Sequence, residues 1–159
     1  MRVETFTFLF TDIEGSTALL GRLGEDAYAQ VLAGHHALIR SALAANDGSE
    51  VDTQGDAFFA VFSSPRACVA AVLQMQQALQ GHVWPGGEQV RVRMGIHCGE
   101  AAKTATGLVG LEVHRAARVA TAGTGRWPRS GPGGVLPPGH FDRGRGVAGG
   151  AGCRCAPYA

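Results

Sequence analysis

The chain has 159 residues, of which 45% are hydrophobic and 17% charged, and its formal net charge is +1 at pH 7. This balance suits a single globular domain and gives no sign of a nucleic-acid partner. No apolar run approaches the roughly 18 residues of a membrane helix, no export signal is visible, and four cysteines form no CxxC pair. We therefore expect a cytoplasmic protein without a membrane segment.

The first predicted element is a strand over residues 3–11, almost entirely apolar, which ends on Asp12 with Glu14 two residues later. Gly15, Ser16 and Thr17 turn the chain into a short helix. A long helix follows over residues 25–45, where apolar side chains recur every three or four positions. His35 and His36 lie in this helix, and one of them is expected to face solvent.

The second half of the predicted domain begins with a hairpin, whose strands span residues 50–53 and 56–62 around a Gln54–Gly55 turn. Ser64 as N-cap and Pro65 at the first helical position open a second long helix. That helix reaches about residue 79, a loop follows over residues 82–87, a strand spans 90–101, and a further helix spans 109–122.

This order of elements predicts an α+β fold, the βαββαβ arrangement of ferredoxin-like proteins. In that fold the first strand lies antiparallel to the second strand of the hairpin, about 4.8 Å away. Asp12, at the end of the first strand, and Asp56, at the start of the other, would then meet at one edge of the sheet.

Two neighbouring carboxylates repel each other unless a cation lies between them, and Mg²⁺ prefers such hard oxygen ligands. Paired magnesium ions are a recurrent device of phosphoryl transfer. The spacing fits a structural interpretation equally well, in which Asp12 caps the following helix and Asp56 closes a turn.

Four motifs occur in order along the chain: FTFLFTDIEGST at 6–17, VDTQGDAFFAVF at 51–62, VRVRMGIHCGEA at 90–101 and GLEVHRAARVA at 110–120. Together they resemble the catalytic domain of class III adenylate/guanylate cyclases, in particular a bacterial branch whose first strand ends FTDIEGST. The resemblance covers residue 3 to about residue 123. It implies the class III cyclase fold and a head-to-tail homodimer, whose sites form at the interface from residues of both chains.

Carried over position by position, the resemblance implies that Asp12, Asp56 and the backbone carbonyl of Ile13 bind two Mg²⁺ or Mn²⁺ ions. These ions would activate the ribose 3′-hydroxyl of ATP or GTP and hold the triphosphate. Attack on the α-phosphate would release pyrophosphate and leave a 3′,5′-cyclic nucleotide such as cAMP, a signalling molecule.

The resemblance also implies two groups that contact phosphate. Gly15, Ser16 and Thr17 lead into a helix whose N-terminal amides could cradle phosphate oxygens. Arg118 falls on the arginine that neutralises charge on the transferring phosphate, a task that suits the donor fork of a guanidinium. The alternative is a surface arginine near Glu112 or His114.

Three positions depart from the pattern of the family. Asp52 stands where a lysine reads the purine, Gly107 stands at the partner base-reading position, and His114 replaces an asparagine that orients the ribose or base. The chain has only one lysine, Lys103, so a small shift of register cannot supply the missing one. The purine is therefore left open, with ATP as the leading candidate, and turnover could be low.

The C-terminal segment is the largest departure. Residues 124–159 hold 10 of the 24 glycines and 5 of the 7 prolines, and their apolar residues show no period. We expect a cyclase domain over residues 1–123 that lacks its C-terminal strands, followed by a disordered tail. Such Gly/Pro/Arg/Ala bias is typical of GC-rich coding DNA read in a shifted frame, and the rival interpretation is a natural flexible extension.

Three functions compete on these observations. The first is a nucleotide cyclase that uses Mg²⁺ or Mn²⁺, supported by Asp12, Asp56 and Arg118. The second is a weak or inactive cyclase-like module that binds nucleotide or pairs with a partner as a regulatory domain, supported by Asp52 and Gly107. The third is a two-metal palm-type nucleotidyl-transfer enzyme, against which the GLEVHRAARV motif argues.

Overall fold

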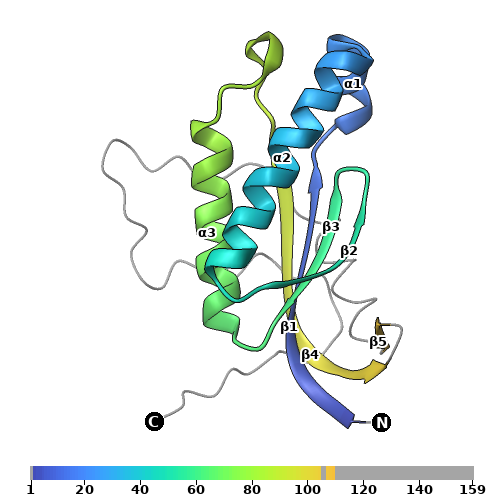
Figure 1. Cartoon of the computed structure of the whole chain (residues 1–159), viewed down its shortest axis with the longest axis vertical. Coiled ribbons are helices and arrows are strands. Elements are labelled where there is room, and N and C mark those ends of the chain that lie inside the picture. Colours follow the sequence, from blue (N-terminus) through green and yellow to red (C-terminus); the bar gives the residue numbers. More distant parts are fainter. Residues whose placement is uncertain (1, 105–106, 110–159) are drawn as a thin grey trace, which may run out of the picture. The chain divides into compact units, whose positions relative to one another are not determined.

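The computed structural model describes residues 2–104 and 107–109 of the chain. Five strands form one antiparallel sheet in the order β2-β3-β1-β4-β5. They are β1 (Arg2–Ile13), β2 (Ser49–Gln54), β3 (Ala57–Phe62), β4 (Val92–Thr104) and β5 (Gly107–Val109). The order β2-β3-β1-β4 is that of the ferredoxin-like core, so the predicted topology is confirmed (Figure 1).

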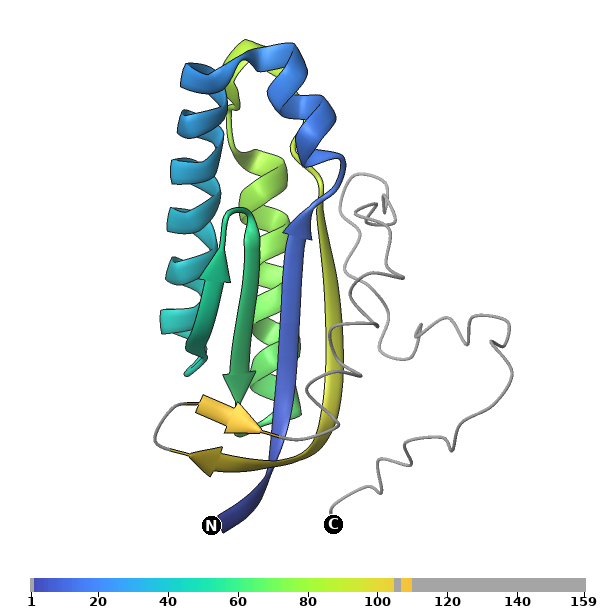
Figure 2. The ribbon, with the colours of Figure 1, turned by 90° about the vertical axis from the view of Figure 1, so that its right-hand side faces the viewer.

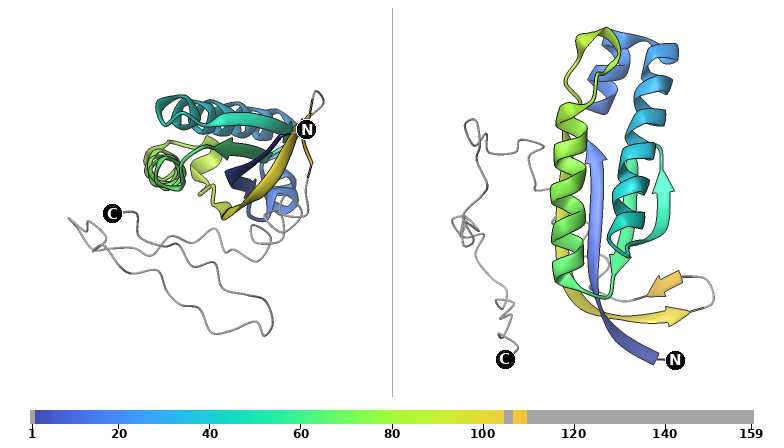
Figure 3. Two further views of the ribbon diagram at one scale, coloured as in Figure 1. Left: turned by 90° about the horizontal axis from the view of Figure 1, so that it is seen from below. Right: turned by 60° about the vertical axis from the view of Figure 1, so that its left-hand side comes forward.

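Three α-helices and one short 3₁₀-helix connect these strands: α1 (Ser16–Leu23), α2 (Glu25–Ala45), α3 (Pro65–Gly81) and η1 (Pro85–Gly87). The side chain of Ser64 caps α3 by accepting a hydrogen bond from the Ala67 amide, and Pro65 occupies the first helical position. Both features agree with the sequence expectation. In Figures 2 and 3, α2 and α3 lie along the same face of the sheet.

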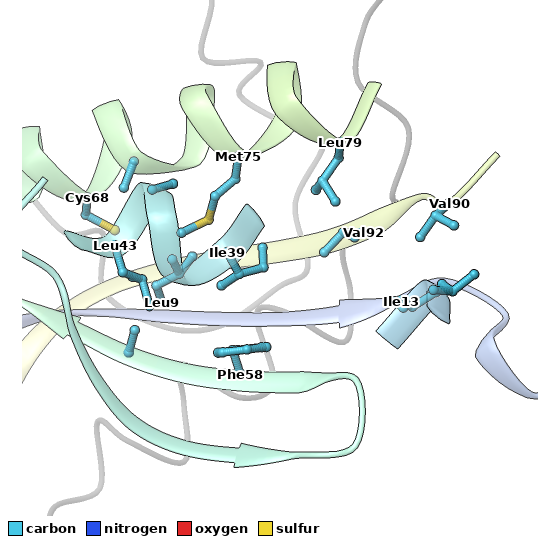
Figure 4. Packing of buried hydrophobic residues seen from close by; sticks show 14 of the residues in the cluster. Leu9, Ile13, Ile39, Leu43, Phe58, Cys68, Met75, Leu79, Val90 and Val92 are labelled. Carbon is cyan, nitrogen blue, oxygen red and sulfur yellow. The ribbon is translucent and has the colours of Figure 1, made fainter. Parts of the chain in front are cut away.

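The main core fills the space between these two helices and the sheet. The pleat of β1 turns Leu9 and Ile13 toward the helices, where they are at most 2% exposed. Figure 4 shows them with side chains from α2, α3, β3 and β4, among them Ile39, Leu43, Phe58, Met75, Leu79 and Val92. Burial of this apolar surface fixes the end of β1, where Asp12 and Ile13 lie.

A second, smaller cluster lies on the opposite face of the sheet. Phe8 and Ala101 are buried in it, and Phe6, Phe10, Phe59 and Val61 pack against them. The rings of Phe10 and Phe59 stack with centroids 4.3 Å apart. The middle of β1 is thus buried on both faces, as its apolar sequence predicts, and the pleat places Asp12 on the same side as Phe8 and Phe10.

The element bounds differ from the sequence expectations at several places, and β1 runs from Arg2 to Ile13 rather than over residues 3–11. The hairpin turn is Gly55–Asp56 rather than Gln54–Gly55, because Gln54 still pairs with Ala57 and extends β2. Strand β4 begins two residues later than expected and continues to Thr104. Val109, expected to begin a helix, ends β5 instead, and the remainder of that predicted helix lies outside the described residues, as does the segment 124–159.

Candidate functional site

The carboxylate of Asp56 is held against the end of β1. Strand β3 pairs with β1 in antiparallel register, with Thr11 opposite Phe58, so the turn before β3 lies beside the last residues of β1. There the backbone N–H of Ile13 donates to Asp56 Oδ2 at 2.8 Å. The Asp56 carboxylate therefore joins the hairpin tip to the end of β1. Its partner Ile13 directly follows Asp12 in the chain, and the sequence predicted that both acids lie at this edge of the sheet.

Asp12 is paired with an arginine from the neighbouring strand. Arg93 lies opposite Asp12 in the β1–β4 register, and its guanidinium donates two hydrogen bonds, from Nε to Oδ1 at 2.8 Å and from Nη2 to Oδ2 at 2.7 Å. These bonds, and then the charge of Asp12, raise the pKa of Arg93 above its usual value. The interpretation of Asp12 as a helix cap is wrong, since Gly15 is the N-cap of α1 and no side chain bonds there.

A second acid–arginine pair, Glu14 with Arg91, lies beside the Asp12–Arg93 pair. The Glu14 amide donates to the Arg91 carbonyl at 2.8 Å, and the side chains of the two residues form an ion pair at 3.5 Å. Glu14 Oε2 is nonetheless buried without a hydrogen-bond partner in the part of the chain that the structure describes. Three acids thus share this end of the sheet with two arginines, and Arg93 lies within the electrostatic reach of Asp12, Glu14 and Asp56.

The N-terminus of α1 adjoins these acids and is open. Gly15 adopts a left-handed conformation (φ 66°), and a Cβ added there would meet no atom within 4 Å. Ser16 and Thr17 form the first helical residues, and the amides of such a first turn have no partner within the helix. This arrangement leaves donors available to an anion beside the acids.

Helix α2 holds the hairpin that carries Asp56. Nε2 of His36 lies 2.7 Å from the carbonyl oxygen of Gly55, the other residue of the turn. One helical turn later, Arg40 forms two hydrogen bonds to Glu50 in β2, at 2.8 and 2.9 Å. The side chain of Tyr28, nearer the start of α2, is hydrogen-bonded to Ser16, and burial, followed by the charge of Asp56, raises its pKa.

The remaining predicted site residues are not part of this cluster of acids and arginines as the structure describes it. Asp52 is exposed on β2 and accepts hydrogen bonds from its neighbours, the Thr53 amide and the Gln54 side chain, both at 2.9 Å. Gly107 begins β5, opposite Thr104. His114 and Arg118 lie outside the described residues.

Sequence reasoning missed Arg93, for which it proposed no role, and His36, for which it proposed no contact. A signal for Arg93 was present: the acids Asp12 and Glu14 and the arginines Arg91 and Arg93 have the same two-residue spacing on strands that neighbour each other in a ferredoxin-like sheet. No comparable pattern marks His36, because its partner is a backbone carbonyl.

The donor set at this sheet edge fits a hard divalent cation. Carboxylate oxygens of Asp12 and Asp56 and the nearby carbonyl of Ile13 are the ligand types that Mg²⁺ and Mn²⁺ prefer, and Mg²⁺ needs only one or two carboxylates. Within residues 2–104 and 107–109, no group of three or more His, Cys, Asp or Glu side chains is gathered as a metal cage. Each oxygen of Asp12 accepts a hydrogen bond from Arg93, so the guanidinium competes with a metal ion for this carboxylate.

The family model for the adenylate and guanylate cyclase catalytic domain matches residues 1–121 of this chain. The chain belongs to this family. The four motifs quoted from the sequence and the ferredoxin-like core are thus parts of one cyclase catalytic domain, as the resemblance implied.

Curated relatives share part of the cyclase domain. The serine/threonine-protein kinase pkn2 of Myxococcus xanthus is 33% identical over 128 residues, covering 77% of this chain and 15% of that protein. A receptor-type adenylate cyclase of Trypanosoma congolense is 41% identical over 81 residues, covering 51% of this chain and 11% of that protein. The chain therefore spans a small fraction of the length of these relatives.

Solved cyclase domains share the fold. The guanylate cyclase domain of RhGC from Catenaria anguillulae, solved with GTP, matches with a TM-score of 0.70 at 21% identity, over 78% of this chain and 76% of that one. An adenylate cyclase from Trypanosoma brucei, solved as a monomer, matches with a TM-score of 0.67 at 26% identity, over 74% of this chain and 67% of that one. Among the described residues, no helix is long and apolar enough to cross a membrane.

Proposed function

We propose that this domain converts a purine nucleoside triphosphate, with ATP as the leading candidate, into its 3′,5′-cyclic monophosphate and pyrophosphate for cyclic-nucleotide signalling in the cytoplasm. The observation that carries the proposal is the 2.8 Å hydrogen bond that fixes the Asp56 carboxylate at Ile13, the residue after Asp12. This bond joins the motifs FTDIEGST and VDTQGD in space, which supports a ligand site made from both.

In this proposal Asp12, Asp56 and the carbonyl of Ile13 hold two Mg²⁺ or Mn²⁺ ions. Bound there, the ions supply positive charge that lowers the pKa of the ribose 3′-hydroxyl and neutralises the triphosphate. The chain's own contribution would be to bring the two carboxylates to the same end of the sheet, and the antiparallel β1–β3 pairing supports this.

Arg93 is a second cationic group at the proposed site, besides the metal ions. Its guanidinium neutralises Asp12 in the structure, and 28% of the Arg93 side-chain surface is exposed. Once a cation takes over that role at Asp12, Arg93 is left beside the open N-terminus of α1 with donors to spare. We propose that both then bind phosphate oxygens, the amides of Gly15, Ser16 and Thr17 from one side and Arg93 from the other.

The rest of the site is proposed on the motif alone. Arg118 would stabilise charge on the transferring phosphate and His114 would orient the ribose or base, both supplied across a homodimer interface. Asp52 and Gly107 occupy the base-reading positions. Because an ionised Asp52 accepts hydrogen bonds and donates none, we expect weak discrimination between ATP and GTP. The domain would span residues 1–123.

The experiment is a product assay on the purified chain with ATP or GTP and Mn²⁺. We expect cyclic nucleotide from the wild type, with similar rates for the two purines, and none from Asp56→Asn. Wild-type activity that survives in Asp56→Asn would show that the acid pair is not the catalytic centre.

A second candidate is a cyclase-like module that binds nucleotide without converting it. It is favoured by Asp52, whose carboxylate is occupied by bonds to its own strand, and by the closed Asp12–Arg93 pair. Nucleotide binding detected by calorimetry, together with no cyclic product at saturating Mn²⁺, would identify this module.

A further inference from the structure

The Asp56 carboxylate depends on a tight turn for its position. Gly55 and Asp56 are the whole connection between Gln54, the last residue of β2, and Ala57, the first of β3. Gly55 has a positive φ of 60°, a conformation that glycine adopts readily and in which no Cβ restricts the backbone. The strand pairing fixes the backbone of this turn, and a contact from outside the hairpin adds a further restraint on the position of Asp56 at Ile13.

His36 supplies such a contact from α2. A carbonyl oxygen only accepts, so Nε2 of His36 carries the hydrogen and donates to Gly55 at 2.7 Å. The imidazole is itself held by the buried ring of Phe58, edge to face, with centroids 5.1 Å apart and an interplanar angle of 84°. The hydrogen-bond donor is thus fixed by the core of the domain rather than by solvent.

Helix α2 contacts the hairpin at two separate positions. Arg40 bonds Glu50 near the start of β2, and His36 bonds the turn at its tip. Only the second contact lies next to Asp56 in the chain. Tyr28, also in α2, is hydrogen-bonded to Ser16 at the start of α1, and the charge of Asp56 contributes to the raised pKa of its side chain after burial.

We propose that His36 is a positioning residue for the metal site: by holding the Gly55 carbonyl, it keeps the Asp56 carboxylate beside Ile13 and Asp12. The inference rests on the proposed function, in which Asp56 is a metal ligand. Removal of a group that orients a metal ligand typically weakens metal binding by about 10- to 100-fold. His36 would act on the binding of the cation and leave the chemical step at saturation nearly unchanged.

The test measures Mn²⁺ binding without turnover, from the free-ion signal in electron paramagnetic resonance, on the full chain. His36→Ala should weaken Mn²⁺ binding by about tenfold. His36→Gln should restore most of the affinity, because the side-chain amide can donate to the same carbonyl. Arg40→Ala is the matched control: it frees the same hairpin from the same helix, away from the turn, and should leave the affinity within about twofold.

A second readout does not need the metal. The Ile13 amide is protected by its bond to Asp56, so His36→Ala should speed hydrogen exchange at Ile13 while amides in the middle of β1 keep their protection. Unchanged exchange at Ile13, or an equal loss of Mn²⁺ affinity in Arg40→Ala and His36→Ala, overturns the inference.

Asp56→Asn separates this inference from the proposed function. If Asp56→Asn binds Mn²⁺ as well as the wild type does, the proposed metal site is wrong, and exchange at Ile13 alone then decides the role of His36. If Asp56→Asn loses Mn²⁺ binding and His36→Ala keeps it, the metal site stands and the positioning role of His36 is refuted.

Discussion

At the scale of single residues, the two acids of the cyclase motifs are restrained by different partners. Asp12 is held by the guanidinium of Arg93 and Asp56 by the backbone of Ile13. The first partner competes with a metal ion for both carboxylate oxygens of Asp12, whereas the Ile13 amide bonds one oxygen of Asp56, Oδ2. The two contacts therefore predict opposite effects when they are removed.

Arg93→Ala should tighten Mn²⁺ binding in the absence of nucleotide, because Asp12 no longer has to release its ion pair. A partly exposed pair contributes about 1 kcal/mol at most, equivalent to roughly a fivefold change in affinity. The same substitution should weaken nucleotide binding, since a donor beside the triphosphate is lost. Arg91→Ala removes the looser pair with Glu14 and serves as the control. Weaker Mn²⁺ binding in Arg93→Ala would contradict this account of Asp12.

His35, adjacent to His36, has a different role at this scale. It is fully buried against Phe58, and neither of its ring nitrogens has a hydrogen-bond partner in the part of the chain that the structure describes. Burial, and then the nearby His36, lower its pKa from 6.5 to about 4. The folded state therefore binds this proton less readily than the unfolded state does, and stability falls as the pH drops below 6.5.

The pH dependence of unfolding tests this assignment. Between pH 7 and pH 5 the free energy of unfolding should fall by about 2 kcal/mol on account of His35. His35→Leu should remove most of that slope in urea titrations, while His82→Ala, at an exposed position, should keep it. A slope that is the same in His35→Leu and the wild type would show that the proton binds elsewhere.

At the scale of elements, the sequence predicts well where the signal is periodic. The bounds of α2 agree with the apolar repeat at both ends, and the Ser64–Pro65 signal places the start of α3. The hairpin turn was misplaced by one residue because Gly55 fits a two-residue turn with either neighbour, and the sequence pattern does not show that Gln54 pairs with Ala57. The approach of Asp56 to β1 followed from topology, but its bond to Ile13 depends on atomic positions that no residue pattern encodes.

The connection between α2 and β2 is tightly packed at Gly48. A Cβ on Gly48 would lie 2.6 Å from ring atoms of Phe62 and 2.8 Å from Leu43 Cδ2, both in the buried core. Gly48→Ala should therefore destabilise the domain by about 1–3 kcal/mol, measured by urea unfolding. Gly21→Ala, in α1 with no atom within 4 Å, should instead be neutral or stabilising by up to about 1 kcal/mol. Equal effects at the two glycines would refute the packing argument.

At the scale of the whole molecule, we propose that the active site is shared between two chains. The acids, α1 and Arg93 lie together at one end of the described domain, whereas Arg118 and His114 belong to the segment outside the described residues. A site at a twofold interface takes one group from each chain, so a chain that lacks its acid can be completed by a partner that keeps it.

Mixing two inactive variants tests this assembly. Asp12→Ala and Arg118→Ala should each be inactive alone. Mixed in equal amounts they should recover roughly a quarter of the wild-type activity, since half the dimers are mixed and each of these has one complete site. Full activity in a wild type that sediments as a strict monomer, or no recovery from dimers shown to exchange, would contradict a shared site.

The central claim is that Asp12 and Asp56 act as one metal site, and a double-mutant cycle of Mn²⁺ binding tests it most directly. Dissociation constants are measured for the wild type, Asp12→Asn, Asp56→Asn and the double variant. We predict that each single substitution weakens binding by at least about tenfold and that the double variant is little worse than either, because loss of one ligand already dismantles the site. Effects that simply add, or a single substitution that leaves Mn²⁺ affinity unchanged, would contradict the claim.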